Sequence, residues 1–120
     1  GYGAMGPLLD GGVDTLRAQF ETNVFAVIGL TRACFPLLRQ SRGLVVNIGS
    51  VSGALVTPFA GAYCASKAAV HALSDALRLE LAPFAIDVLE VQPGAIASSF
   101  GATASRGAEA LIASRSPYNW

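Results

Sequence analysis

The longest regular pattern of apolar residues runs from Val13 to about Gln40 and has helical spacing. Asp14 is a plausible N-cap for this segment, and Gly43 follows it as a stop signal. The sequence therefore predicts one long and mostly buried helix. The apolar positions that define it are Leu16, Phe20, Val24, Val27, Ile28 and Leu38.

Two short apolar runs have the pattern of buried parallel strands: LVVNIG over Leu44–Gly49 and IDVLEV over Ile86–Val91. A helical segment from about Gly61 to Leu81, followed by Pro83, separates them. A strand, a helix and a second strand in this order form a right-handed crossover with parallel strands. The predicted fold class is α/β. Two strands do not make a stable parallel sheet, so more sheet is expected elsewhere.

The remainder of the chain shows no linker and no internal repeat. After Phe100 the tail is rich in Ala and Ser, and a short helix is expected only around Ala108–Ala113. Residues 1–120 are therefore interpreted as one incomplete domain. The chain opens on Gly-Tyr-Gly without a Met or a signal-peptide pattern, so we expect that it begins in mid-sequence.

The composition is unusually apolar. Hydrophobic residues make up 52% and charged residues 13% of the 120 residues, about half of the usual charged fraction. We therefore expect apolar faces that a partner or further chain covers. Eight basic and eight acidic residues without a basic cluster argue against nucleic acid or an anionic membrane as a partner.

A membrane span and a metal site are also not indicated. The uncharged stretch from Gly43 to Ser66 contains too many polar residues and glycines for an apolar helix. Cys34 and Cys64 stand thirty residues apart without neighbouring ligand residues, which favours two buried thiols over a disulfide or a metal site. This interpretation predicts a reducing, cytoplasmic location.

The opening hexapeptide GYGAMG fits the dinucleotide-binding pattern G-x-G-x-x-G. The pattern requires a preceding strand and an immediately following helix, because the helix N-terminus faces the pyrophosphate. The given sequence shows no strand before Gly1, and a breaker-rich stretch including Pro7 and Gly11 follows the hexapeptide. We therefore do not interpret GYGAMG as a cofactor loop.

Candidate chemistry lies where the two strands end. Ser50 follows the first strand, Pro93 and Gly94 follow the second, and ligands bind at this edge of parallel sheets. Tyr63 and Lys67 are four residues apart at the start of the intervening helix, which places them on one face. A neighbouring ammonium favours the phenolate form of a tyrosine, so the pair can act as an acid/base device.

The alternative is an ordinary amphipathic pair on a solvated helix face. Two further polar residues favour the functional interpretation. Ser50 lies thirteen residues before Tyr63, and Asn23 lies within the predicted buried helix, where an amide needs a partner. His71 is expected to be structural, since Ser50, His71 and Asp75 lack the arrangement of a hydrolase triad.

Four motifs together resemble the short-chain dehydrogenase/reductase family from Gly1 to about Phe100: ETN at Glu21–Asn23, VVNIGSVSG at Val45–Gly53, YCASKAAV at Tyr63–Val70 and QPGAIAS at Gln92–Ser98. The resemblance implies a partial Rossmann-like, doubly wound fold with parallel strands and flanking helices. Gly1 is similar to the last glycine of the family's Asn-Asn-Ala-Gly motif. The glycine-rich dinucleotide-binding half is then expected upstream of this chain.

The resemblance implies an oxidoreductase that uses NAD or NADP and interconverts an alcohol with a ketone or aldehyde by hydride transfer. Tyr63 would exchange the proton, Lys67 would favour its phenolate and hold the nicotinamide ribose, Ser50 would bind the substrate oxygen, and Asn23 would organise a relay water. Ser98 stands where the family usually has threonine. The implied cofactor contacts are Gly1, Asn23, Tyr63, Lys67, Pro93, Gly94, Ile96 and Ser98, with Ala95 and Ile96 beside the carboxamide.

The sequence leaves several choices open. The resemblance suggests a lipophilic alcohol or carbonyl substrate, and a homodimer or homotetramer that pairs the helix of Gly61–Leu81 with that of Val13–Gln40. NAD and NADP are not distinguished. The competing hypothesis is a truncated, non-catalytic fragment or an oligomerisation module of such an enzyme.

Overall fold

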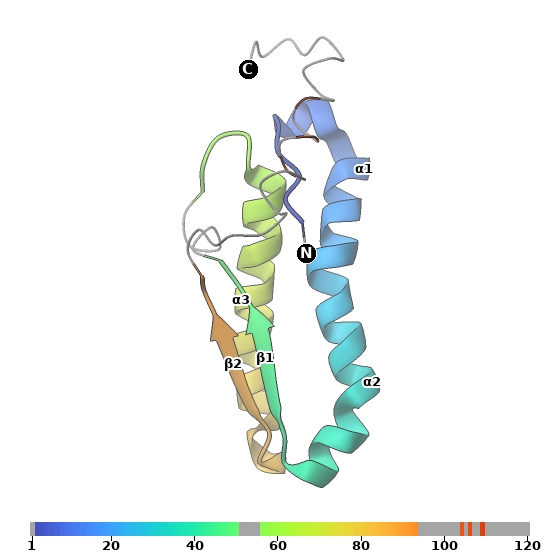
Figure 1. The fold of residues 1–120 in the computed structure, drawn as a ribbon, viewed down its shortest axis with the longest axis vertical. Helices are drawn as coiled ribbons and strands as arrows, with labels where there is room; N and C mark the ends of the chain where they lie inside the picture. The colour runs from blue at the N-terminus through green and yellow to red at the C-terminus, as the bar shows by residue number, and fades with distance from the viewer. Residues whose placement is uncertain (1, 51–55, 94–103, 105, 107–108, 110–120) are drawn as a thin grey trace.

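The computed structural model describes residues 2–50 and 56–93, together with residues 104, 106 and 109. The molecule is elongated, with extents of 53 × 26 × 21 Å. Its elements, in chain order, are α1 (Leu8–Phe20), the π-helical segment η1 (Glu21–Phe25), α2 (Ala26–Ser41), β1 (Leu44–Ile48), α3 (Gly61–Leu81), the 3₁₀ turn η3 (Ala82–Phe84) and β2 (Asp87–Val91). Figure 1 shows the two strands lying along α3, with the α1–η1–α2 arm beside them.

The arm begins earlier than predicted. Helix α1 starts at Leu8 after Pro7, and Gly12 (φ 63°, ψ −165°) interrupts its regular backbone. The helix continues regularly from the predicted start at Val13 because glycine adopts this positive φ without steric cost. The prediction of Asp14 as the N-cap was wrong. Its Oδ1 instead accepts a hydrogen bond from Arg17 Nη1 at 3.3 Å.

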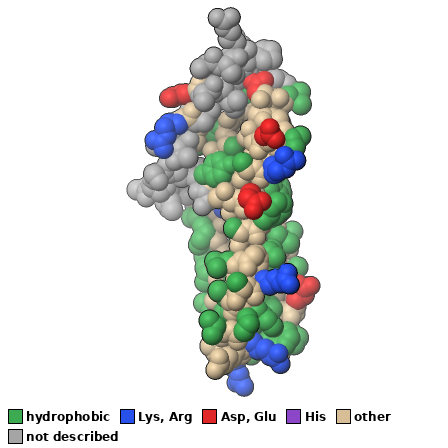
Figure 2. All heavy atoms as spheres, turned by 90° about the vertical axis from the view of Figure 1, so that its right-hand side faces the viewer, with side chains coloured by type: hydrophobic (Ala, Val, Ile, Leu, Met, Phe, Trp, Pro, Cys, Tyr) green, Lys and Arg blue, Asp and Glu red, His purple; other side chains and the backbone are tan. Residues whose placement is uncertain are grey.

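The C-terminal end of the arm also differs from the prediction in detail. Arg42 and not Gly43 takes the left-handed conformation (φ 53°), while the Gly43 amide donates to the Leu38 carbonyl at 3.1 Å. The expectation of a mostly buried helix was wrong, since α2 has no buried residue and Leu30 and Leu37 are each 69% exposed. The arm packs on one side only, and Figure 2 shows hydrophobic side chains along its outer face.

The two strands pair in parallel, from Leu44 opposite Asp87 to Ile48 opposite Val91. This confirms the α/β class with a parallel strand pair. Side chains alternate along each strand, so one face of the pair meets the helices and the other is exposed. The helix-facing core consists of Leu81, Ile86 and Val88, with Phe35, Leu38, Val45 and Leu77 packed around them. The exposed apolar residues of the other face are Leu44, Val46, Ile48, Leu89 and Val91.

The cysteines are free, but only Cys64 is buried. Cys34 is partly exposed because α2 is uncovered on its outer side, so the expectation of two buried thiols was wrong for Cys34. Within residues 2–50 and 56–93, no helix is long and apolar enough to span a membrane. Most of the helix expected around Ala108–Ala113 lies outside the described residues, and Glu109 is helical.

Candidate active site at the strand ends

Both strands end at the same edge, where the crossover brings α3 alongside them. Ile48 pairs with Val91, and the Gly49 amide donates to the Val91 carbonyl at 2.6 Å. Ser50 and Pro93 follow immediately, so the structure places them at this edge as predicted. Such an edge is where ligands bind in open parallel sheets, because the loops there leave a crevice.

Tyr63 and Lys67 occupy successive turns at the start of α3 and share one helical face, as predicted. The Lys67 Nζ lies 5.8 Å from the centroid of the Tyr63 ring. The Tyr63 side chain belongs to the buried core, with 9% exposure. This burial is inconsistent with the alternative interpretation of a pair on a solvated face. A phenol and an ammonium at this separation can influence each other's protonation.

Lys67 connects α3 to the end of β1. Its Nζ donates to the Ile48 carbonyl at 3.1 Å, two residues before Ser50. Burial lowers the pKa of Lys67, and the negative charge of Glu90 opposes this shift. The structure therefore holds a partly desolvated ammonium at the strand ends, between the helix and the sheet.

Asn23 lies in η1, in the middle of the arm. Its Oδ1 accepts from the Tyr2 amide at 3.1 Å, and its Nδ2 donates to the Tyr2 carbonyl at 2.9 Å and to Ser66 Oγ at 3.3 Å. π-helical turns often occur at functional sites, because the widened turn re-aims side chains. Asn23 thus joins the N-terminal segment and the arm to α3 at Ser66, the residue before Lys67 in the sequence.

The sequence analysis missed Gln19, which is fully buried one turn before Asn23. Gln19 Nε2 donates to the Tyr2 carbonyl at 2.6 Å, and its Oε1 accepts from the Ala4 amide at 2.7 Å. Gln19 and Asn23 therefore bind the same N-terminal segment. Their four-residue spacing within an apolar helix is the signal that could have identified Gln19.

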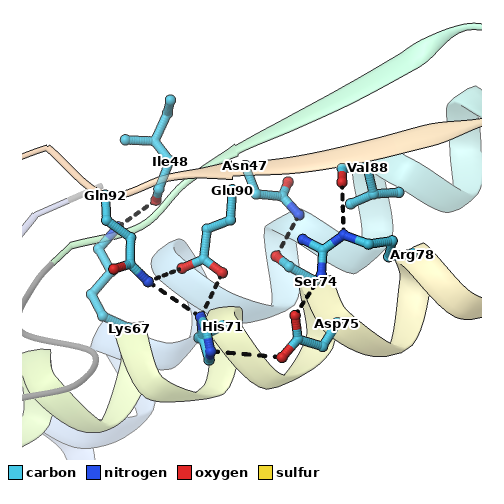
Figure 3. A network of polar contacts seen from close by, with 10 residues as sticks. All are labelled: Asn47, Ile48, Lys67, His71, Ser74, Asp75, Arg78, Val88, Glu90 and Gln92. Carbon is cyan, nitrogen blue, oxygen red and sulfur yellow. Dashed lines mark hydrogen bonds and ion pairs between the residues drawn. The ribbon is translucent and has the colours of Figure 1, made fainter.

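Five polar residues of α3 form a stripe that faces the sheet, as the close-up in Figure 3 shows: Lys67, His71, Ser74, Asp75 and Arg78. Asn47 Nδ2 donates to Ser74 Oγ at 2.9 Å. His71 Nδ1 lies 2.8 Å from Glu90 Oε2, which agrees with a structural role for the histidine. Glu90 was also missed by the sequence analysis, although it is a carboxylate near the end of a strand whose other members after Asp87 are apolar.

Several predicted contacts lie outside the described residues: Gly1, Gly94, Ala95, Ile96 and Ser98. Pro93 is described and half-buried at the end of β2. The approach of the Ser50 hydroxyl to the Tyr63 phenol stays a prediction. Within the part of the chain that the structure describes, no three His, Cys, Asp or Glu residues are grouped as metal ligands.

Comparison with known proteins identifies the family to which this chain belongs. A family model described as short chain dehydrogenase matches residues 1–109. A probable short-chain type dehydrogenase/reductase, VdlC of Helicobacter pylori, is 39% identical over 105 residues, covering 87% of this chain and 39% of that protein. A 3-ketodihydrosphingosine reductase of Bacteroides thetaiotaomicron is 40% identical over 101 residues, covering 83% of this chain and 38% of that protein. The chain thus spans about two fifths of the length of these relatives.

Solved structures of proteins in complex with a nicotinamide cofactor share the fold of this chain. A short-chain dehydrogenase of Sphingobium yanoikuyae in complex with NADPH is 33% identical, with a TM-score of 0.80 over 88% of this chain and 41% of that chain. A short chain dehydrogenase/reductase of Burkholderia phymatum in complex with NAD is 28% identical, with a TM-score of 0.80 over 92% of this chain and 41% of that chain. The family model, the sequence relatives and the solved structures agree with one another, and this chain belongs to the short-chain dehydrogenase/reductase family.

Proposed function

We propose that the full-length protein is an NAD- or NADP-dependent oxidoreductase that interconverts an alcohol with a ketone or aldehyde. The observation that carries this proposal is the buried Tyr63 ring, whose centroid lies 5.8 Å from the Lys67 ammonium. Both residues lie near the edge of the sheet where β1 ends and Ser50 follows. A buried phenol beside a cation can exchange a proton at a substrate oxygen. The relatives bound to NADPH and to NAD support the choice of cofactor class.

The residues of this site fit a nicotinamide cofactor. An ammonium has three N–H donors, and the bond from Lys67 to the Ile48 carbonyl uses one of them. The others can donate to ribose hydroxyls in the crevice beyond the strands. A bound nicotinamide supplies the chemistry of hydride exchange with the substrate carbon.

In the oxidation direction, the substrate hydroxyl loses its proton to Tyr63 while its carbon loses a hydride, and reduction reverses both transfers. Lys67 favours the phenolate that accepts this proton, because opposite charges attract in a partly desolvated site. We assign the Ser50 hydroxyl to a hydrogen bond with the substrate oxygen. The side chain of Asn23 binds the Tyr2 backbone, so a contribution of Asn23 to a proton relay would come from its backbone.

We further propose a lipophilic alcohol or carbonyl compound as the substrate. The support is the similarity to a relative named 3-ketodihydrosphingosine reductase. We also propose a cytoplasmic location, supported by the free thiols of Cys34 and Cys64. A panel of long-chain and short-chain alcohols, assayed with the full-length protein and each dinucleotide, tests the substrate class and the activity together.

The second candidate function is that of a non-catalytic fragment or an oligomerisation module. The observation that favours it is the row of small exposed residues on the outer face of α3, which suits close helix packing in a homodimer or homotetramer. This face includes Ala65, Ala68, Ala72 and Ala76. Dinucleotide binding by the 120-residue chain, compared with binding by the full-length protein, separates the two functions. Tight binding by both would contradict the fragment hypothesis.

A further inference from the structure

Glu90 presents a buried carboxylate at the edge of the candidate site. Its side chain is 6% exposed. An ionised carboxylate at this depth requires hydrogen-bonding or charged partners. His71 Nδ1 lies 2.8 Å from Oε2, and Gln92 Nε2 donates to Oε1 at 3.3 Å. Figure 3 shows the carboxylate held between these two side chains, on the side of β2 that faces α3.

The backbone at Gly49, directly after β1, leaves room for this carboxylate. Glu90 lies opposite Asn47 in the strand register, and its side chain extends over Gly49. A Cβ atom on Gly49 would clash with Glu90 Oε1 and would lie 3.1 Å from Cδ. A side chain at position 49 would therefore require the Glu90 carboxylate to shift from this place. The approach places the carboxylate beside the backbone of Gly49, the residue that follows Ile48.

Lys67 is anchored one residue before Gly49, because its Nζ donates to the Ile48 carbonyl at 3.1 Å. His71, which binds Glu90, follows Lys67 by one turn on the same stripe of α3. The Lys67 ammonium and the Glu90 carboxylate therefore lie at the same end of the crossover, where both strands end. Burial lowers the pKa of Lys67, and the charge of Glu90 acts in the opposite direction.

The other charged groups near this pair lie further along α3. His71 Nε2 lies 3.6 Å from Asp75 Oδ2, and Arg78 Nη1 lies 2.7 Å from Asp75 Oδ1. Strand β1 has the uncharged sequence LVVNI and contributes no charge. Glu90 is therefore the acidic group best placed to act on Lys67.

We propose that Glu90 is a positioning residue whose carboxylate favours the ammonium form of Lys67 at the strand ends. The proposal rests on the function proposed for Lys67, because only an ammonium stabilises a neighbouring phenolate. Without the carboxylate, desolvation favours the neutral amine. His71 and Gln92 serve this arrangement by fixing the orientation of the carboxylate.

The test is Glu90→Gln in the full-length protein, a substitution that retains the shape of the side chain and removes its charge. The pKa of the Lys67 amine is measured from the pH dependence of competitive amine acylation, followed by mass spectrometry of the peptide, without cofactor. We expect this pKa to fall by on the order of one unit. In the cofactor-loaded enzyme, the alkaline limb of kcat should move to lower pH by a similar amount.

Asp75→Asn is the matched control, because it also removes one carboxylate from this network but at a greater distance from Lys67. It should leave the Lys67 pKa nearly unchanged. Glu90→Asp retains the charge, so the Lys67 pKa should stay close to its wild-type value. A purely structural role of Glu90 predicts instead that Glu90→Asp lowers the Lys67 pKa as much as Glu90→Gln does. Should Glu90→Gln not fold, Gly49→Ala displaces the same carboxylate, and the Lys67 pKa is expected to fall there too.

An unchanged Lys67 pKa in the folded Glu90→Gln or Gly49→Ala variant would overturn the proposal, whatever the activity. An equal fall of the Lys67 pKa in Asp75→Asn would also overturn the proposal, because the loss of any one negative charge would then lower this pKa. A lowered Lys67 pKa in Glu90→Gln together with full turnover of Tyr63→Phe would support the role of Glu90 and refute the proposed function of Tyr63. The two hypotheses therefore fail separately.

Discussion

The Tyr63 hydroxyl is the single group on which the proposed proton transfer depends. In the full-length protein, Tyr63→Phe keeps the buried ring and removes the hydroxyl, so turnover should fall at least about 10²- to 10⁴-fold, as is typical of lost acid/base catalysis. Affinity for the dinucleotide should barely change. Steady-state kinetics and a dinucleotide titration measure the two effects, and Lys67→Ala serves as a comparison that should reduce both. Near-normal turnover of Tyr63→Phe would assign the proton to Ser50 or to a bound water.

The lowered pKa of Lys67 also predicts a pH dependence of stability. Burial disfavours the ammonium, so the folded protein loses the Lys67 proton at a lower pH than the unfolded chain, whose amine has the ordinary value of 10.5. Between these two values the unfolded chain binds more protons, and stability rises with pH as the cost of burying the charge is relieved. Below the folded-state pKa this cost is fully present.

Urea unfolding of the full-length protein and of Lys67→Met over this alkaline range measures the effect. The free energy of unfolding of the wild type, relative to Lys67→Met, should increase as the pH rises through the folded-state pKa. The comparison removes contributions from other titrating groups, because both proteins share them. A difference that stays constant with pH would show that Lys67 is not desolvated.

At the scale of elements, buried polar pairs fix α3 against the sheet. Asn47 Nδ2 donates to Ser74 Oγ at 2.9 Å, and both residues are buried. Ser74→Ala leaves this amide without its partner and should lower the free energy of unfolding by about 1–3 kcal/mol. Ser41→Ala is the matched control, since its hydroxyl donates to the Leu37 carbonyl at 2.9 Å on an exposed helix end. The control should change stability by less than about 0.5 kcal/mol.

Denaturant unfolding monitored by circular dichroism compares the two variants. Equal losses of unfolding free energy in Ser74→Ala and Ser41→Ala would contradict the view that the buried Asn47–Ser74 hydrogen bond contributes more to stability than an exposed one. The alternation of β1 gives the reason for expecting a difference. Asn47 is the buried position of that strand, whereas Val46 and Ile48 on its opposite face are exposed.

At the scale of the whole molecule, two apolar surfaces lack cover within the described residues. One is the sheet face with Val46 and Leu89, and the other is the outer side of the arm with Leu30 and Leu37. Exposed surfaces of this kind and an open sheet edge promote association. We expect the 120-residue chain by itself to self-associate and to be inactive.

Size-exclusion chromatography with light scattering measures the association, and the change in nicotinamide absorbance with an alcohol measures activity. The full-length protein provides the control for both measurements. A monodisperse monomer of the 120-residue chain that oxidises alcohols would show that these surfaces need no further cover.

The sequence by itself determined the features that depend on local backbone geometry. A helix has 3.6 residues per turn, so the spacing of Tyr63 and Lys67 was enough to place both on one face. The apolar runs before Ser50 and Pro93 predicted two parallel strands that end together, and their register confirms this. Such inferences need only the few neighbouring residues of one turn or one strand.

Only the tertiary structure decided which side chains from distant segments meet. Asn23 binds the backbone of Tyr2, and Glu90 lies between His71 and the backbone at Gly49. These contacts depend on the register between the strands and on which face of α3 turns toward the sheet, which no local pattern specifies. The burial of the arm was mispredicted for the same reason. Helical periodicity identifies an apolar face, but the exposure of Leu37 depends on what packs against that face.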